Sequence, residues 1–192
     1  VFYNYHNQFD YLIKFCGNLR NIEQIFVNFI IPKPEPNSLL ASRELCGGAL
    51  MDMGSYAASI HRTFFKENIT YKNVVIKKSK NGLVTSFDIF FKYKTKVLVG
   101  TFRFGGEYRN DICVILKDKT IEVGRLFSPP DDIKLNIKIN TKNKVKNVKI
   151  KKDNCFENYL LEVIKNIKLN KLRYYQSNMI KDEYVRLKII PK

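Results

Sequence analysis

The chain has 192 residues, of which 45% are hydrophobic and 13% aromatic, and it carries a formal net charge of +16. This composition excludes a disordered chain and is sufficient for one well-packed domain. The charge would fit a nucleic-acid partner, but most of the excess lysine is spread through segments that are also rich in Asn and Ile, such as 139–152. A basic nucleic-acid-binding domain is therefore the last of the functions that we weigh.

The sequence contains no clear targeting signal, no paired-cysteine motif and no metal-binding motif. No apolar run approaches the ~20 residues that a membrane-spanning helix needs, and the first residues lack the order of a signal peptide. We therefore expect a cytoplasmic protein with no membrane partner. Because the cysteines are far apart and mostly have apolar neighbours, we expect buried free thiols. These are Cys16, Cys46, Cys113 and Cys155. With only His6 and His61 available, we expect no metal site.

In chain order, the N-terminal part predicts a short strand, then a helix over Asn7 to Cys16, a Gly-Asn turn, and a strand from Glu23 to Ile31. The next segment, 32–45, contains three prolines. Because prolines exclude both a helix and a central strand, this segment is predicted to be a loop, of the kind that often lines a site.

From Ala49 to about Phe65, apolar positions recur at spacings of three and four, which predicts an amphipathic helix. The pattern then changes to the alternation of strands. Strand patterns with turn signals between them occupy 70–79, 82–93, 96–105, 111–118 and 119–127. Consecutive strands without intervening helices indicate a largely antiparallel sheet.

The segment 133–150 also alternates and predicts one or two lysine-rich strands that are exposed on one face. Helical spacing returns at 154–169, and a Ser-Asn cap begins a last predicted helix at 177–190. The predicted fold class is α+β, with a large, mostly antiparallel β-sheet and helices on one face. We expect a single domain over 1–192.

The stretch "GGALMDMGSY", residues 47–56, resembles the G-G-[GA]-x-L-x-D-x-G-x-[HY] signature in the C-terminal substrate domain of the Gfo/Idh/MocA oxidoreductase family. Residues 106–132 are similar to the strand hairpin of that family, and 154–167 to its late helix. The resemblance covers almost the whole chain in the right order and is greatest for the nucleotide-sugar 3-ketoreductases. The N-terminal Rossmann domain of the family and its Glu-Lys-Pro motif, which supplies a catalytic lysine, are not in this sequence. Because the chain also begins at Val1 rather than Met, we expect a piece of a longer polypeptide.

The resemblance implies a site on the helix that follows the glycine pair. Tyr56 would donate a proton to the C3 oxygen of the sugar, and Asp52 would orient the sugar hydroxyls or the absent lysine. That lysine is what would lower the pKa of the phenol from its usual ~10. Gly47 and Gly48 would lie near the nicotinamide. The implied substrate contacts are His6, Asn7, Gln8, Arg43, Tyr108 and Arg109.

Structural interpretations of the same residues stay open. Tyr56 could pack on the core face with Met53 and Ile60, and Asp52 could be a helix-start acid that accepts from backbone N–H groups. The glycine pair could serve only as a turn.

The resemblance implies the substrate-binding and oligomerisation domain of an NAD(P)-dependent nucleotide-sugar oxidoreductase, a ketoreductase of deoxysugar or surface-polysaccharide synthesis. NAD or NADP would be bound mainly by the missing domain, so this chain alone would be inactive. We expect a homo-oligomer that assembles through the sheet face. The alternative is a stand-alone, non-catalytic sugar-binding or scaffold module.

Overall fold

The computed structural model describes residues 1–66 and 68–169. Within them, the strands form one eight-stranded sheet in the order β2-β3-β4-β1-β5-β6-β7-β8. The strands are β1 (Ile22–Ile31), β2 (Tyr71–Lys78), β3 (Val84–Tyr93), β4 (Lys96–Phe104), β5 (Arg109–Leu116), β6 (Lys119–Gly124), β7 (Leu135–Thr141) and β8 (Lys144–Ile150). The α-helices are α1 (Asn7–Cys16), α2 (Ala49–Phe65) and α3 (Cys155–Lys168), and the 3₁₀ turns are η1 (Phe2–Tyr5), η2 (Leu19–Asn21) and η3 (Leu39–Ala41).

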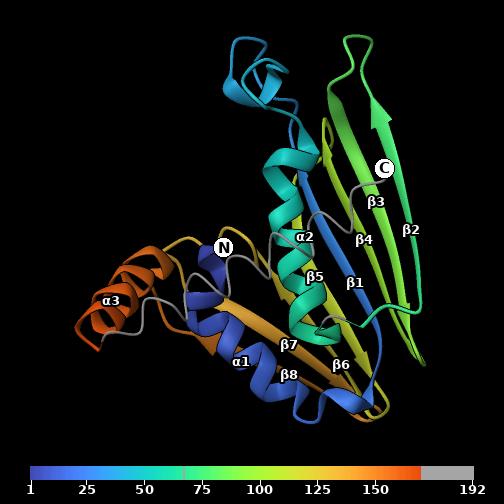
Figure 1. Cartoon of the computed structure of the whole chain (residues 1–192). Coiled ribbons are helices and arrows are strands. Elements are labelled where there is room, and N and C mark those ends of the chain that lie inside the picture. Colours follow the sequence, from blue (N-terminus) through green and yellow to red (C-terminus); the bar gives the residue numbers. More distant parts are fainter. Residues whose placement is uncertain (67, 170–192) are drawn as a thin grey trace.

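All neighbouring strands are antiparallel except β1 and β4, which run parallel. Strand β1 lies between β4 and β5, so the earliest strand of the chain occupies the middle of the sheet (Figure 1). The prediction of a mostly antiparallel sheet in an α+β fold is confirmed.

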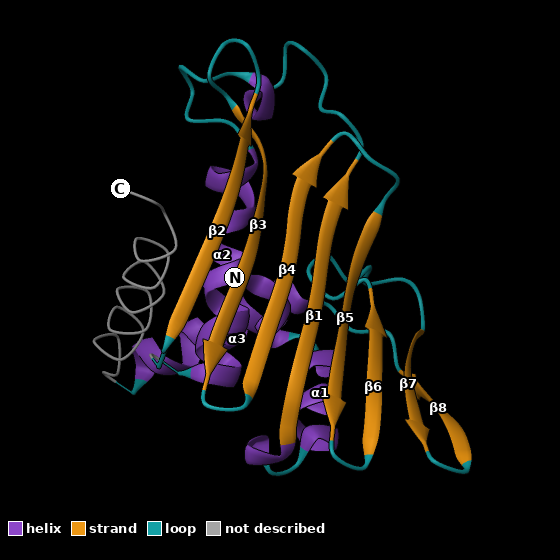
Figure 2. Ribbon diagram, turned by 90° about the vertical axis from the view of Figure 1, so that its right-hand side faces the viewer, coloured by secondary structure: helices purple, strands orange, loops and turns teal. Residues whose placement is uncertain are grey.

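Helices α1 and α2 cover the same face of the sheet, and none of the described helices covers the opposite face, which is called the uncovered face below (Figure 2). Helix α2 packs on β3 and β4, and α1 packs on β6 and β7. The core lies between these layers, where the rings of Phe87 and Phe102 stack with centroids 4.8 Å apart. Helix α3 instead lies beside η1.

Local signals explain the helix ends. His6 caps α1 by accepting a hydrogen bond from the backbone N–H of Gln8, and Gly17 ends that helix with φ 59°. Asn154 caps α3 by accepting from the backbone of Phe156 and Glu157. The helices predicted over Asn7 to Cys16 and from Ala49 to about Phe65 are confirmed with the same bounds.

Two predictions are wrong and one lies outside the described residues. The short N-terminal strand is instead η1, because buried Tyr3 packs its ring against Phe9 and Phe127 and donates a hydrogen bond to Ser59 rather than joining the sheet. The cysteines are free, but Cys46 is exposed because it lies in the loop before α2, and two others are only half-buried. The helix predicted at 177–190 lies outside the described residues. Among those described, no helix is both long enough and apolar enough to cross a membrane.

Candidate functional site

The candidate site begins at the glycine pair ahead of α2. Gly48 is the N-cap residue, with φ 102° and ψ 154°, a conformation that is essentially restricted to glycine. Gly47 lies so close to the preceding loop that a Cβ would come within 2.7 Å of the carbonyl oxygens of Leu39, Leu40 and Ser42. The pair therefore holds the loop against the start of α2 and fixes where this helix begins.

Asp52 and Tyr56 follow in the first half of α2, one turn apart, and both are half-buried. Asp52 lies in the first turn of α2, and burial raises the pKa of its carboxyl. Gly48 has the N-cap position, and the side chain of Asp52 accepts no hydrogen bond from the backbone of the described residues. The structure thus gives no support to Asp52 as a capping acid.

Burial also raises the pKa of the Tyr56 phenol, and the negative charge of Asp52, and that of Cys155 when its thiol is ionised, raise it further. The phenol is therefore protonated at neutral pH and can donate a hydrogen bond or a proton. No described cation contributes to lowering its pKa. The lysine that the family resemblance places beside Tyr56 has no counterpart among the described residues.

An aromatic cluster fixes the ring of Tyr56 at the margin of the core. Its centroid lies 5.2 Å from those of Phe29 on β1 and Phe127 after β6, and 6.1 Å from that of Tyr3 in η1. All three of these neighbours are buried, whereas Tyr56 is only half-buried. A ring held from three sides has little freedom, so its hydroxyl is held in a defined position.

The start of α3 also reaches this region, which the sequence patterns did not indicate. Cys155, in the first turn of α3, lies near enough for its charge to raise the pKa of Tyr56. Just before it, the side chain of Asn154 donates to Asp131 at 3.4 Å. Burial raises the pKa of Cys155 itself, so the thiol is neutral at pH 7. The sequence predicted a helix at 154–169, but no local signal could place its start beside α2.

Of the three consecutive residues His6, Asn7 and Gln8, the first and last are buried. The Nδ1 of His6 accepts from the backbone of Gln8, and the Gln8 side chain donates to the carbonyl of Gly124 at 3.0 Å. The backbone N–H of exposed Asn7 donates to Asp153 at 2.7 Å. These interactions join the start of α1 to β6 and α3, so each residue has a structural task. Substrate contact by any of the three stays a prediction.

Tyr108, just before β5, and Arg109, its first residue, lie on opposite faces of the sheet because side chains alternate along a strand. The hydroxyl of Tyr108 is 3.1 Å from Ser128, next to the Phe127 ring that packs against Tyr56. Arg109 forms an ion pair of 3.0 Å with Asp111. Both members of this pair lie on the uncovered face. Tyr108 is therefore near the aromatic cluster, while Arg109 is separated from it by the sheet.

Arg43 lies at the exposed tip of the loop before α2, where its guanidinium donates to the carbonyl of Asn81 at 3.4 Å. It lines a hollow of about 660 Å³ with Pro36, Glu44 and other loop residues. Arg43 is thus near the glycine pair in the chain but does not belong to the cluster around Tyr56. Among the described residues, no group of three or more His, Cys, Asp or Glu side chains could hold a metal ion.

Comparison with solved structures gives close matches of fold. The 3-ketoreductase KijD10 of Actinomadura kijaniata, in complex with NADP and TDP-benzene, aligns with a TM-score of 0.79 at 15% identity over 86% of this chain and 52% of its own. An aldose-aldose oxidoreductase of Caulobacter crescentus, complexed with glycerol, aligns with a TM-score of 0.73 at 12% identity over 96% of this chain and 61% of its own.

The UDP-N-acetylglucosamine 3-dehydrogenase GnnA of Acidithiobacillus ferrooxidans aligns with a TM-score of 0.68 at 10% identity, over 88% of this chain and 52% of its own. No protein-family model and no curated protein sequence matches the chain. The chain spans between 52% and 61% of the length of these three solved structures. Over most of its length, this chain has the fold of the C-terminal part of the Gfo/Idh/MocA oxidoreductases.

Proposed function

We propose that the chain is the substrate-binding and oligomerisation domain of an NAD(P)-dependent oxidoreductase that acts at C3 of a nucleotide sugar in the cytoplasm. The observation that carries this proposal is the Asp52–Tyr56 pair, held behind the glycine pair on α2 of a fold shared with a 3-ketoreductase and a 3-dehydrogenase. In this proposal the domain covers 1–192, and a cofactor domain outside this sequence completes the enzyme.

The described residues fit the substrate side of such a reaction. Tyr56 is protonated, and its ring is fixed by Phe29 and Phe127, so its hydroxyl can hold a sugar oxygen and give it a proton. The half-buried carboxylate of Asp52 can accept hydrogen bonds from neighbouring sugar hydroxyls, and these bonds would offset part of its desolvation. NAD or NADP, bound by the other domain, would supply or take the hydride.

Gly47 and Gly48 do not by themselves identify a cofactor site. Position 47 has to be glycine because a side chain would collide with carbonyl oxygens of the preceding loop. Position 48 has to be glycine because of its backbone conformation. Their nearness to a nicotinamide follows only from the resemblance and stays a proposal.

A test begins with the coding DNA upstream of Val1, where a strand, a glycine-rich turn, a helix and a Glu-Lys-Pro motif should lie in frame. In the polypeptide that it encodes, Tyr56→Phe should lower kcat for NAD(P)H-dependent reduction of a 3-keto nucleotide sugar by at least about 100-fold. Tyr71→Phe, which changes an exposed tyrosine on β2, should have no effect. Full activity of the Tyr56 variant would contradict the proposal.

One observation favours the non-catalytic alternative. The groups among the described residues that shift the pKa of Tyr56, Asp52 and Cys155, are both acidic, so neither makes the phenol a better acid. A stand-alone module would use the same hydroxyl only to bind a sugar. This alternative predicts that sugar affinity falls on Tyr56→Phe while NAD(P)H has no effect on binding and is never oxidised.

The proposed oligomer would form through the uncovered sheet face. Phe90, Val99, Phe26 and Cys113 pair across β3, β4, β1 and β5, and they form an apolar row at the centre of this face. Phe26 and Phe90 are 38% and 36% exposed, unusually high for ring side chains in the middle of a sheet. If a second copy covers the row, Phe26→Asp should convert a dimer to a monomer in light scattering. A wild-type chain that is already monomeric would refute the dimer.

A further inference from the structure

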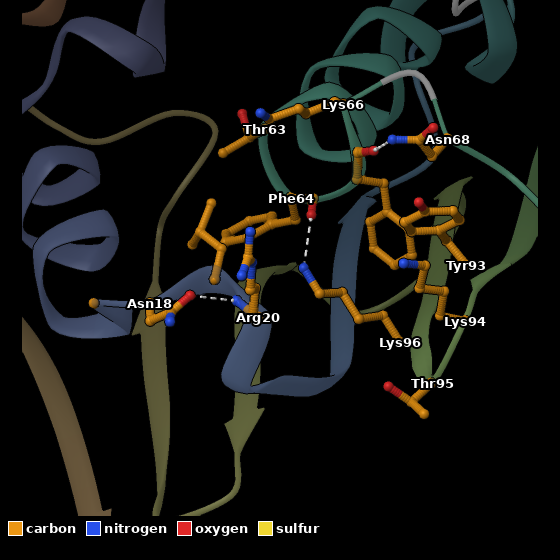
Figure 3. Close-up of a pocket in the computed structure, with 13 residues that line it drawn as sticks. Asn18, Arg20, Thr63, Phe64, Lys66, Asn68, Tyr93, Lys94, Thr95 and Lys96 are labelled. Atoms are coloured by element: carbon orange, nitrogen blue, oxygen red, sulfur yellow. Dashed lines mark hydrogen bonds between the residues drawn. The ribbon is translucent and has the colours of Figure 1, made fainter.

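A separate hollow of about 840 Å³ lies at the C-terminal end of α2 (Figure 3). It is bounded by the end of α2, by the turn between α1 and β1, and by the hairpin turn between β3 and β4. Its volume lies in the range of pockets that bind small organic ligands. It is lined by Gly17, Asn18, Leu19, Arg20, Thr63, Phe64, Phe65, Lys66, Asn68, Tyr93, Lys94, Thr95 and Lys96. None of these residues belongs to the candidate site around Tyr56.

Among the described residues, the charged side chains of the lining are all cations. Arg20, Lys66, Lys94 and Lys96 contribute four cations from three separate segments, and none of the described lining residues is acidic. Figure 3 shows Arg20 and Lys96 extending toward the space beneath Phe64 from opposite sides. The ion pairs found among the described residues involve other parts of the molecule. A concave surface lined by several cations concentrates anions.

Two of the cations are held by contacts that leave donors available. The ammonium of Lys96 donates to the carbonyl of Phe64 at 3.3 Å, which uses one of its three donors, and burial lowers its pKa. The ammonium of Lys94 lies 5.5 Å above the ring of Tyr93. Both groups are positioned before any ligand arrives, which reduces the entropy lost on binding.

Two lysines also stand where the backbone favours glycine. Lys66, after α2, has φ 58° and ψ −120°, nearly the same as φ 59° and ψ −116° at Gly17 after α1. Lys94 has φ 55° at the first position of the two-residue turn between β3 and β4, where a positive φ usually calls for glycine. A side chain in such a conformation lowers stability. Both strained lysines line the same hollow, whereas the other described non-glycine residues with positive φ, Cys46 and Arg125, lie elsewhere.

We propose that this hollow binds an oligophosphate, either free or as the diphosphate of a nucleotide. Adjacent phosphate groups carry several negative charges a few ångströms apart, which suits a hollow that is lined with cations from three segments. The inference does not rest on the proposed function, since the hollow and the Tyr56 site share no residue.

The test is calorimetric titration of the chain with pyrophosphate and with uridine diphosphate, with sulfate as a simple anion for comparison. We expect one site per chain, and about tenfold weaker binding in each of Lys66→Gln and Arg20→Gln, the loss of one charge-assisted hydrogen bond. Lys77→Gln and Lys149→Gln remove the same charge from exposed strand positions and should leave the affinity unchanged. Tyr56→Phe should also leave it unchanged.

Lys66→Gly separates the charge from the backbone strain. It should weaken pyrophosphate binding as Lys66→Gln does, while raising the melting temperature of the free chain by about 2–4 °C. If Lys66 had only a structural role, its replacement would change the melting temperature and not the affinity.

Three results would overturn the proposal. The first is the absence of pyrophosphate and uridine diphosphate binding at millimolar concentration. The second is an equal loss of affinity in the strand controls, which would assign binding to the overall positive charge. The third is affinity for oligonucleotides that grows with their length and exceeds that for pyrophosphate, which would indicate a nucleic-acid surface. Tighter binding of uridine diphosphate than of pyrophosphate would identify a nucleotide, and equal binding a free oligophosphate.

Discussion

Replacing Gly47 with alanine tests the packing that sets the start of α2. The new Cβ would lie within 2.7 Å of the carbonyl oxygens of Leu39, Leu40 and Ser42, and no rotamer change can relieve contacts with backbone atoms. The loop would have to move, and the bonds from Gly47 N–H to Ser42 (2.7 Å) and from the next residue's N–H to Leu40 (2.9 Å) would weaken or break. Overpacking costs about 1–3 kcal/mol and each of the two hydrogen bonds about 1 kcal/mol, so we expect a loss of about 3–5 kcal/mol if both bonds break.

Urea denaturation followed by circular dichroism at 222 nm measures this loss. Gly124→Ala is the matched control, because a Cβ at Gly124 meets nothing within 4 Å. The control should stay within about 0.5 kcal/mol of the wild type. Equal midpoints for Gly47→Ala and wild type would refute the close approach. If Gly47 served only a nicotinamide, its replacement would lower cofactor affinity in the complete enzyme without changing the stability of this chain.

Asp52→Asn should raise the melting temperature at pH 7. Burial raises the pKa of this carboxyl, which means that the ionised form is less stable in the folded chain than in the unfolded chain, and the substitution removes that cost. The gain in melting temperature should be complete above the folded-state pKa of Asp52, shrink as pH falls through that pKa, and vanish below about 3.8. A gain in melting temperature that is independent of pH would exclude this explanation. In titration with Ellman's reagent at pH 8, exposed Cys46 should react first and buried Cys16, whose pKa is raised to about 12, should react only on unfolding. Loss of the fast phase in Cys46→Ser would verify the order, and a fast phase that survives would disprove it.

Strong local signals allowed much of the fold to be predicted. The uninterrupted spacing of apolar residues from Ala49 and the glycine pair before it predicted α2 with its observed bounds. The alternating patterns likewise predicted the antiparallel strands. The aromatic stretch Phe2–Tyr5 was misread because its alternation fits a strand, but it has no strand to pair with and Tyr3 packs on α2 instead. The periodicity of apolar residues indicates which residues are buried, but it does not indicate which helix or strand they pack against.

The order and relative direction of strands that are far apart in the chain could not be predicted from the sequence. Nothing local in β1 shows that it lies between β4 and β5 and pairs in parallel with β4, because that choice is made by the whole sheet. The same limit applies to the site. The one-turn spacing of Asp52 and Tyr56 follows from helix geometry, but the approach of Cys155 depends on how α3 packs.

The charges along α2 constrain how Tyr56 could act. Near the start of the helix, the groups that influence the phenol are Asp52 and Cys155, which both raise its pKa. The cations along this helix lie toward its other end, with Arg62 about 9 Å and Lys66 about 15 Å from Tyr56 along the helix axis at 1.5 Å per residue. Neither of them contributes to the pKa shift of the phenol. If Tyr56 is a proton donor in a reductase, the cation that makes it acidic must therefore come from a part of the enzyme outside the described residues. A complete enzyme without such a cation would support the binding-module alternative.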